Sequence, residues 1–426
     1  MTYEQALSYI GTVSARSGKP GFQRMKALMD GLGNVQNGLK FVHLAGTNGK
    51  GSTSCMLSNI LQKAGYKTGL FVSPFIVRFN ERVQINGRYI PDEKLAELVE
   101  RVKPVADALE DGATEFELIT AIGFLWFAEE QCDIVVLETG LGGRLDATNI
   151  IETNECAVIT TIGIDHTDFL GNTVEAIAYE KACIMKQGRP VVAYNSVPAA
   201  LQVIKDYAEN HGNPMTVADF HALESVSADL TGQTFRYKGG EDYRIKLLGP
   251  HQMKNASVVL ETVETLRGLG WEISADAVRE GLAAAQWPAR FELLHTDPIV
   301  FVDGAHNMQG VESLCAAVEA YLGGRRVICV TGVLADKDWQ PMMALLSGFA
   351  SDFITLTPDS PRALANTALA EHLAKTAEWV MPADGVAEAM ELALERAKET
   401  DSVVVACGSL YMASEVRDYF PSTKSE

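Results

Sequence analysis

A glycine-rich segment at residues 46–52 contains the side chains and backbone best suited to binding phosphate. Lys50 supplies a positive charge, and the small residues around it leave backbone N–H groups free to donate to phosphate oxygens. Residues 41–45 are apolar except for His43 and predict a buried strand, and apolar residues recur at helical spacing after residue 52. A strand, a glycine loop and a helix in this order predict a phosphate site at the helix N-terminus. We expect this site to contain Gly46, Thr47, Asn48, Gly49, Lys50, Gly51 and Ser52.

The segment does not follow the strict P-loop pattern G-x-x-x-x-G-K-[ST]. Leu44 stands at the position of the first glycine, and Gly51 stands where Ser or Thr is required. The loop by itself therefore leaves open a surface turn whose lysine is solvated. The strand expected before it and the helix expected after it favour phosphate binding.

Three further polar residues directly follow segments that read as strands. Ser73 follows residues 67–72, Glu138 follows residues 133–137, and His166 lies beyond a strand predicted over residues 156–162. Strands that alternate with helices predict an α/β fold with a parallel, doubly wound sheet, whose ligands bind beyond the carboxyl ends of the strands. We therefore expect these residues and the glycine loop to meet at one edge of the sheet.

A second α/β series begins near residue 299, after a segment at 287–292 that we interpret as a hinge. We therefore expect two domains, residues 1–289 and residues 290–426. Short apolar runs between residues 215 and 250 predict a small β insertion or an antiparallel edge.

Composition narrows the class of protein. The chain has 426 residues with 36 Lys and Arg against 55 Asp and Glu, a net charge of −19, which disfavours general binding to nucleic acid or anionic membranes. Its seven cysteines are scattered, which favours reduced thiols and a cytoplasmic location. We expect no signal peptide, because the N-terminus lacks a basic stretch followed by an apolar one. We also expect no membrane-spanning segment, because no apolar run is long enough.

Several motifs, taken together and in order, resemble the folylpolyglutamate synthases, the folate branch of the Mur ligase superfamily. This family includes bifunctional members that are also dihydrofolate synthases. The resemblance implies an N-terminal P-loop-type ATPase domain and a smaller, Rossmann-like C-terminal domain. It also implies a monomer that uses ATP to add L-glutamate to a folate carboxylate through an acyl phosphate. The motifs span residues 46–52, 73–81, 138–149, 165–171, 180–186, 287–292, 303–307, 334–338 and 408–411.

The resemblance also implies roles for individual residues. Ser73, Glu138 and His166 match Mg²⁺ ligands, and Lys181 matches a lysine whose carbamylated form would hold a second Mg²⁺. The alternative for Lys181 is an exposed charge pair with Glu180. The residues that match positions contacting ATP from the linker and the second domain are Asn255, Arg290 and Asp303.

Three more residues have an ordinary structural alternative or bear on the substrate. His306 matches a residue near the reacting phosphate, or it caps a loop. Asp146 matches a residue that faces the pterin, or it caps a helix. Phe75 stands where many members have His, so it bears on substrate preference. Arg290, which matches a position that contacts ATP, has an alternative role in an inter-domain salt bridge. Other departures from the family pattern are Cys183 in place of Gly and Met308 in place of Pro.

The sequence leaves the acceptor open between folates alone and folates together with dihydropteroate. A Mur-type ligase for peptidoglycan precursors is the alternative enzyme, since it shares the ATP loop and the chemistry. An ATP-binding regulatory protein without ligase activity is the alternative from another class.

Overall fold

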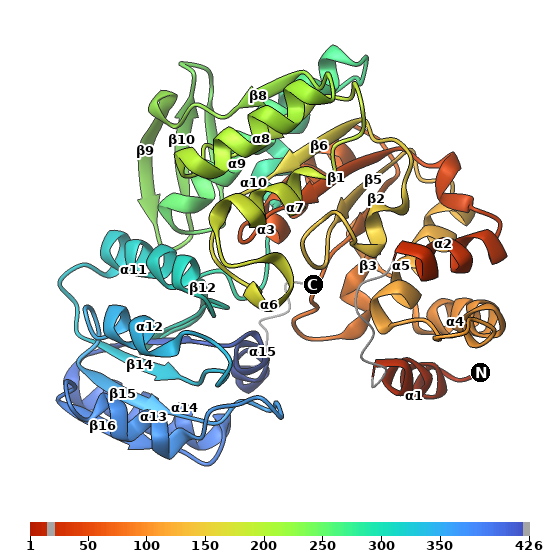
Figure 1. Ribbon diagram of the computed structural model, residues 1–426. Helices are drawn as coiled ribbons and strands as arrows, with labels where there is room; N and C mark the ends of the chain where they lie inside the picture. Colours follow the sequence, from red (N-terminus) through yellow and green to blue (C-terminus); the bar gives the residue numbers. More distant parts are fainter. Residues whose placement is uncertain (15–21, 421–426) are drawn as a thin grey trace. The chain divides into compact units, whose positions relative to one another are not determined.

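The computed structural model describes residues 1–14 and 22–420 and divides the chain into two compact units (Figure 1). Unit 1 contains Met1–Leu223, Tyr237–Gly239 and Lys254–Ala285. Unit 2 contains Glu224–Arg236, Gly240–Met253 and Gln286–Glu426. Each unit is built on a largely parallel sheet with helices, which confirms the α/β fold expected from the sequence.

Unit 1 is organised around an eight-stranded sheet in the order β4-β3-β2-β5-β1-β6-β7-β8. The six strands from β2 to β8 in this order run parallel, and β3 and β4 add an antiparallel edge that the sequence did not predict. The strands are β1 (Phe41–Ala45), β2 (Thr68–Phe71), β3 (Val83–Ile85), β4 (Arg88–Tyr89), β5 (Ile134–Glu138), β6 (Cys156–Ile159), β7 (Val191–Ala193) and β8 (Met215–Val217).

The central strands of unit 1 are buried along their whole length, because helices cover both faces of a parallel sheet. Thr114 caps the start of α5 by accepting from the Glu117 N–H, and α5 is apolar on nearly all sides, as suits a helix inside the core. The helices are α1 (Tyr3–Ser14), α2 (Phe22–Gly31), α3 (Lys50–Lys63), α4 (Asp92–Asp107), α5 (Glu115–Glu129), α6 (Thr167–Leu170), α7 (Val174–Ala182), α8 (Pro198–Asn210), α9 (Pro250–Gly268) and α10 (Ala275–Ala284). Short 3₁₀ turns are η1 (Val35–Gly38), η2 (Phe79–Arg82), η3 (Ala147–Ile150) and η4 (Phe220–Ala222).

Two hydrophobic clusters lie against the unit 1 sheet. One joins Phe41 to residues of α1, α2, α4 and α5, and the other joins Ala45 to residues of α7 and α8. Phe41 and Ala45 are four positions apart on one strand, so their side chains point to the same face of the sheet. The helices at the two ends of β1 therefore cover that face as neighbouring groups.

Unit 2 contains a six-stranded sheet in the order β12-β13-β17-β14-β15-β16. Its core includes residues of α11, α12 and α13 together with Phe301, Cys329 and Phe353 from three of the strands. The strands are β12 (Glu292–Thr296), β13 (Ile299–Val302), β14 (Val327–Thr331), β15 (Asp352–Thr355), β16 (Trp379–Pro382) and β17 (Val403–Cys407). The helices are α11 (Met308–Leu322), α12 (Trp339–Leu346), α13 (Asn366–Leu373), α14 (Val386–Thr400) and α15 (Leu410–Tyr419).

A small sheet in the order β11-β10-β9 accounts for the expected β insertion. It consists of β9 (Leu223–Asp229), β10 (Gly232–Tyr237) and β11 (Asp242–Ile245), and most of its residues belong to unit 2. The expected hinge at 287–292 leads into β12, an antiparallel edge strand that pairs with β13. The strands β9 and β12 are exposed at several positions, so neither shows the apolar run of a central strand.

Candidate functional site

The glycine-rich loop at residues 46–49 connects β1 to the 14-residue helix α3. Gly49 has a φ of +83°, a left-handed conformation that glycine adopts without steric cost. A Cβ atom added at Gly46 would lie 1.7 Å from the hydroxyl oxygen of Thr160. Glycine at these two positions therefore allows the compact loop, which presents backbone N–H groups at the N-terminus of a helix as phosphate sites do.

Two threonines beyond the end of β6 hold this loop in place. The Thr47 N–H donates to the Thr161 carbonyl at 2.7 Å, and the Thr160 hydroxyl donates to the Asn48 carbonyl at 2.8 Å. The sequence predicts a strand through residue 162, but β6 ends at Ile159. The predicted strand includes Thr160 and Thr161, so the sequence does not mark them as loop anchors. Two hydroxyl residues after an apolar run are nevertheless a signal for the end of a strand.

Asn255 on α9 lies against the same loop. Its side-chain oxygen would be 2.8 Å from a Cβ atom added at Gly49, so the two residues are in close contact. Gly51 and Ser52 belong to the first turn of α3, and Ser52 is buried. The structure thus brings Asn255 to the loop across more than 200 residues of sequence.

Lys50 and Lys181 meet at one carbonyl oxygen. The Lys50 amino group donates to the Gly46 carbonyl at 3.1 Å, and the Lys181 amino group donates to the same oxygen at 2.9 Å. Glu138 also lies near Lys50, with 3.9 Å between the Lys50 nitrogen and a carboxylate oxygen. The structure therefore gathers two lysine amino groups and one buried carboxylate at the start of the glycine loop.

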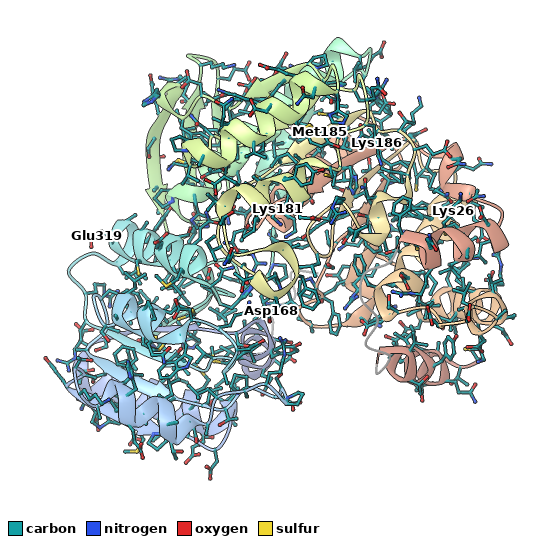
Figure 2. The ribbon with its side chains drawn as sticks, in the orientation of Figure 1. Lys26, Asp168, Lys181, Met185, Lys186 and Glu319 are labelled. Carbon is teal, nitrogen blue, oxygen red and sulfur yellow. The ribbon has the colours of Figure 1, made fainter. Side chains whose placement is uncertain are left out.

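Lys181 is buried on α7, and Met185 and Lys186 lie on the segment that follows the helix (Figure 2). Burial, followed by the nearby charge of Lys50, lowers the pKa of Lys181 from its ordinary value of 10.5 to about 7. Glu180 points instead to Arg144, with 2.8 Å between nitrogen and oxygen. The alternative of an exposed charge pair between Lys181 and Glu180 is therefore wrong, because Lys181 is buried and Glu180 pairs with the exposed Arg144.

The expected metal ligands lie at or beyond the carboxyl ends of three parallel strands of the unit 1 sheet, β2, β5 and β6. Glu138 is the last residue of β5, Ser73 lies just beyond β2, which pairs with β5, and His166 lies beyond β6. His166 is exposed, has a φ of +51°, and precedes the short helix α6. Among the described residues, no group of three or more His, Cys, Asp and Glu side chains is arranged to hold a metal ion.

Asp146 caps the 3₁₀ turn η3. Its carboxylate accepts from the Thr148 N–H at 3.0 Å, from the Thr148 hydroxyl at 2.5 Å and from the Leu141 N–H at 2.8 Å. Burial raises the pKa of Asp146, and these hydrogen bonds oppose that rise. The cap that the sequence leaves open is therefore present, and the same carboxylate closes the loop between residues 141 and 146.

This loop also packs directly on α7. A Cβ atom added at Gly143 would lie 2.6 Å from the Glu180 carbonyl oxygen and 3.2 Å from the Lys181 Cα. The Arg144 N–H donates to the Glu180 carbonyl at 2.9 Å. Sequence reasoning did not identify Gly143 or Arg144 as positioning residues, because the contact joins segments nearly 40 residues apart.

Phe75 belongs to an aromatic group around Arg82. The Arg82 guanidinium lies 5.2 Å from the centre of the Phe75 ring and 5.1 Å from that of Phe79, and it pairs with Glu115 at 3.0 Å. The rings of Phe75 and Phe79 meet edge to face. Phe75 stands out in the sequence, whereas Arg82 does not, because only the turn η2 brings Arg82 beside Phe75.

In unit 2, Asp303 and His306, two residues that the family resemblance marks as site residues, follow β13. The Asp303 carboxylate accepts from the Phe291 N–H and the Ala305 N–H, both at 2.7 Å. Burial raises the pKa of Asp303, and the nearby charge of Arg290 opposes this. The His306 ring donates from Nδ1 to the Gly304 carbonyl at 2.8 Å, which is the loop-capping contact.

Comparisons with known proteins extend over almost the whole chain. Residues 44–263 match the Mur ligase middle domain, and residues 289–410 match the Mur ligase, glutamate ligase domain. The dihydrofolate synthase/folylpolyglutamate synthase of Bacillus subtilis (strain 168) is 40% identical, covering 97% of this chain and 98% of its own.

Solved structures agree with this assignment. A Mycobacterium tuberculosis folylpolyglutamate synthase, complexed with ADP and AMPPCP, has a TM-score of 0.89 at 30% identity and covers 98% of this chain and 99% of its own. An FPGS–AMPPCP–folate complex has a TM-score of 0.86 at 32% identity, covering 98% and 99%. This chain belongs to the Mur ligase family, in its branch of folylpolyglutamate and dihydrofolate synthases.

Proposed function

We propose that this protein uses ATP to add L-glutamate to the carboxylate of a folate. The observation that carries the proposal is the meeting of Lys50, Lys181 and Glu138 at Gly46 of the glycine loop. The relatives named dihydrofolate synthase/folylpolyglutamate synthase and the folate complex of a structural neighbour support the choice of acceptor over a peptidoglycan precursor.

The chemistry requires an activated carboxylate, because a carboxylate oxygen is a poor leaving group. Transfer of the terminal phosphoryl group of ATP would give an acyl phosphate, and the amine of glutamate would then attack its carbonyl carbon and release phosphate. Such a transfer depends mainly on positioning and charge neutralisation. Lys50 suits this role, since its amino group lies at the start of the loop that would hold the phosphates.

Mg²⁺ fits the chemistry of the residues at this edge of the sheet. Glu138 offers a buried carboxylate and Ser73 a hydroxyl, both of which are hard oxygen donors, and His166 would complete the set. Bound Mg²⁺ would neutralise phosphate charge during the transfer. We propose these three residues as its ligands.

We further propose that Lys181 is carbamylated and helps to hold a second Mg²⁺. The neutral amine attacks CO₂, forming a nitrogen–carbon bond and releasing one proton, so the product is an anion in place of a cation. A pKa of about 7 leaves much of the amine neutral at physiological pH. Cys183 does not stop the Lys181 amino group from reaching the Gly46 carbonyl.

The remaining expected residues divide between ATP and the acceptor. Asn255, Arg290 and Asp303 would contact ATP, and His306 would orient the acyl phosphate through its Nε2, since Nδ1 is used in the loop. Asp146 and Phe75 would face the folate, and Asp146 would exchange one of its loop N–H donors for a donor of the pterin. We place the domain division between residues 289 and 290.

We also propose that the protein acts as a cytoplasmic monomer that binds small molecules and neither nucleic acid nor membranes. In the part of the chain that the structure describes, none of the helices has the length and apolar character needed to span a bilayer.

The test is phosphate release from ATP and Mg²⁺ in the presence of L-glutamate, with tetrahydrofolate, dihydropteroate or a Mur precursor as acceptor. Mass spectrometry checks for one added glutamate. Release with tetrahydrofolate alone identifies a dedicated folylpolyglutamate synthase, and release with dihydropteroate as well identifies the bifunctional enzyme. ATP binding without release for any acceptor would overturn the proposal in favour of a regulatory protein.

A further inference from the structure

His43 is a polar residue fully buried in the middle of β1. Its side chain points to the same face of the sheet as Phe41 and Ala45, which belong to two different hydrophobic clusters. His43 therefore lies where the α5 group of helices meets the α7 group. An imidazole buried between apolar clusters is costly unless its nitrogens are hydrogen-bonded, so its contacts need an explanation.

A chain of two hydrogen bonds joins His43 to the loop before η3. The His43 Nε2 lies 2.9 Å from the Thr148 hydroxyl oxygen, and that hydroxyl lies 2.5 Å from an Asp146 carboxylate oxygen. Asp146 in turn accepts from the Leu141 N–H through its other oxygen. One buried side chain of the central strand is thus connected to both ends of the segment 141–146.

The partners fix the direction of each hydrogen bond. Backbone N–H groups donate to both oxygens of Asp146, which favours the carboxylate, so the single hydroxyl proton of Thr148 goes to Asp146. The Thr148 oxygen can then only accept from His43, which places the ring proton on Nε2. The Nδ1 atom has no hydrogen-bond partner among the described residues.

The charge of His43 agrees with this arrangement. Burial, followed by the charge of Lys186, holds the pKa of His43 well below its ordinary value of 6.5. The ring is therefore neutral under ordinary assay conditions and offers one fixed N–H donor.

The relay is separate from the anchors of the phosphate loop. Residues 47 and 48 are held by Thr160 and Thr161, which follow β6, a neighbour of β1 in the sheet. Loss of the His43 donor therefore leaves those anchors in place, although His43 is only three residues from Gly46. The relay instead ends at Asp146, in the loop that we propose for the folate acceptor.

We propose that His43 is a positioning residue for the folate acceptor, acting through Thr148 to fix the Asp146 carboxylate and the loop 141–146. This inference rests on the proposed folate contact of that loop. It makes acceptor binding depend on a side chain inside the sheet that touches none of the substrates.

The test compares two matched pairs of variants in the full chain. His43→Leu removes the donor at similar volume, and His43→Gln restores an N–H donor. Thr148→Val removes the hydroxyl at equal shape, and Thr148→Ser keeps it. For each variant, KM for tetrahydrofolate and for ATP, kcat and the unfolding temperature are measured, and the double variant His43→Leu/Thr148→Val completes the cycle.

We expect His43→Leu and Thr148→Val each to raise KM for tetrahydrofolate by roughly ten-fold, the value of about one net hydrogen bond. KM for ATP should stay within about two-fold, Thr148→Ser and His43→Gln should recover most of the loss, and the double variant should be no worse than either single one. An equal rise in KM for ATP, additive losses, or no difference between Thr148→Ser and Thr148→Val would overturn the inference.

The tautomer provides a readout that does not depend on turnover. The ¹⁵N shifts of the imidazole, assigned with His43→Gln, should show a neutral ring protonated on Nε2. A ring protonated on Nδ1 would contradict the relay even in an active enzyme. Wild-type protein that forms no glutamate adduct would instead contradict the proposed function, so the two failures are distinguishable.

Discussion

Lys50 and Lys181 donate to the same carbonyl oxygen, that of Gly46, although 131 positions separate them in the sequence. Two lysine side chains at one acceptor repel each other when both are charged, and this is the second cause of the low pKa of Lys181 after burial. Lys50 starts the helix that follows the glycine loop, whereas Lys181 arrives from α7. Their meeting defines the centre of the proposed site.

Lys181→Ala should reduce phosphate release by at least roughly 100-fold, because the proposed ligand of a second Mg²⁺ is lost. Added bicarbonate should not restore the activity. Lys186→Met is the matched control, because Lys186 is also a mostly buried lysine but bonds to Asn149 rather than to Gly46. Turnover of Lys181→Ala close to that of the wild type would exclude the carbamate role.

Carbamylation should increase with pH through about 7, because the reactive form of Lys181 is the neutral amine. A carbamate signal in ¹³C NMR with labelled bicarbonate should be weak at pH 6 and strong at pH 8, and absent in Lys181→Met. The same signal at both pH values would contradict the lowered pKa.

The lowered pKa of Lys181 also predicts a stability effect of definite sign. The folded chain releases this proton near pH 7, and the unfolded chain releases it near pH 10.5. Between these values the unfolded state binds more protons, so the free energy of unfolding contributed by this group rises with pH. Below pH 7 the folded protein carries the full free-energy cost of burying a charged Lys181. Denaturant titrations at pH 6 and pH 9 should show a smaller rise in Lys181→Met than in the wild type.

Gly46→Ala should abolish nucleotide binding, because the added Cβ would lie 1.7 Å from the Thr160 hydroxyl oxygen and 3.3 Å from its carbonyl carbon. The added atom would also lie 2.9 Å from the Thr160 Cβ, and rotation of the hydroxyl does not relieve that contact, so the backbone must shift and the loop changes shape. Gly11→Ala on α1, where a Cβ meets nothing within 4 Å, is the control and should leave binding intact. Calorimetric titration with ADP distinguishes the two, and wild-type affinity in Gly46→Ala would be incompatible with the loop as described.

Phe75→His should change the ratio of kcat/KM for dihydropteroate to that for tetrahydrofolate, by roughly five-fold if one aromatic contact of about 1 kcal/mol is lost. The ring of Phe75 contacts both Arg82 and Phe79, so its replacement alters the surface near Ser73 without entering the phosphate loop. A proportional change for both acceptors would show that Phe75 does not set preference.

The sequence by itself determined the α/β fold, the strand–loop–helix at residues 41–63, and the places of Ser73 and Glu138 at the carboxyl ends of β2 and β5. These follow from local patterns, because apolar runs, glycine positions and strand–helix alternation are visible within short windows and parallel strands share one carboxyl edge.

Tertiary structure decided which side chains are buried and which pairs meet. Lys181 and Glu180 are adjacent in the sequence, yet one enters the site and the other pairs with Arg144. The relay from His43 to Asp146 and the threonine anchors of the loop join segments about 100 residues apart, as does the contact of Asn255 with Gly49 across about 200. No local pattern encodes such contacts, because they depend on sheet order and on the depth at which each residue lies.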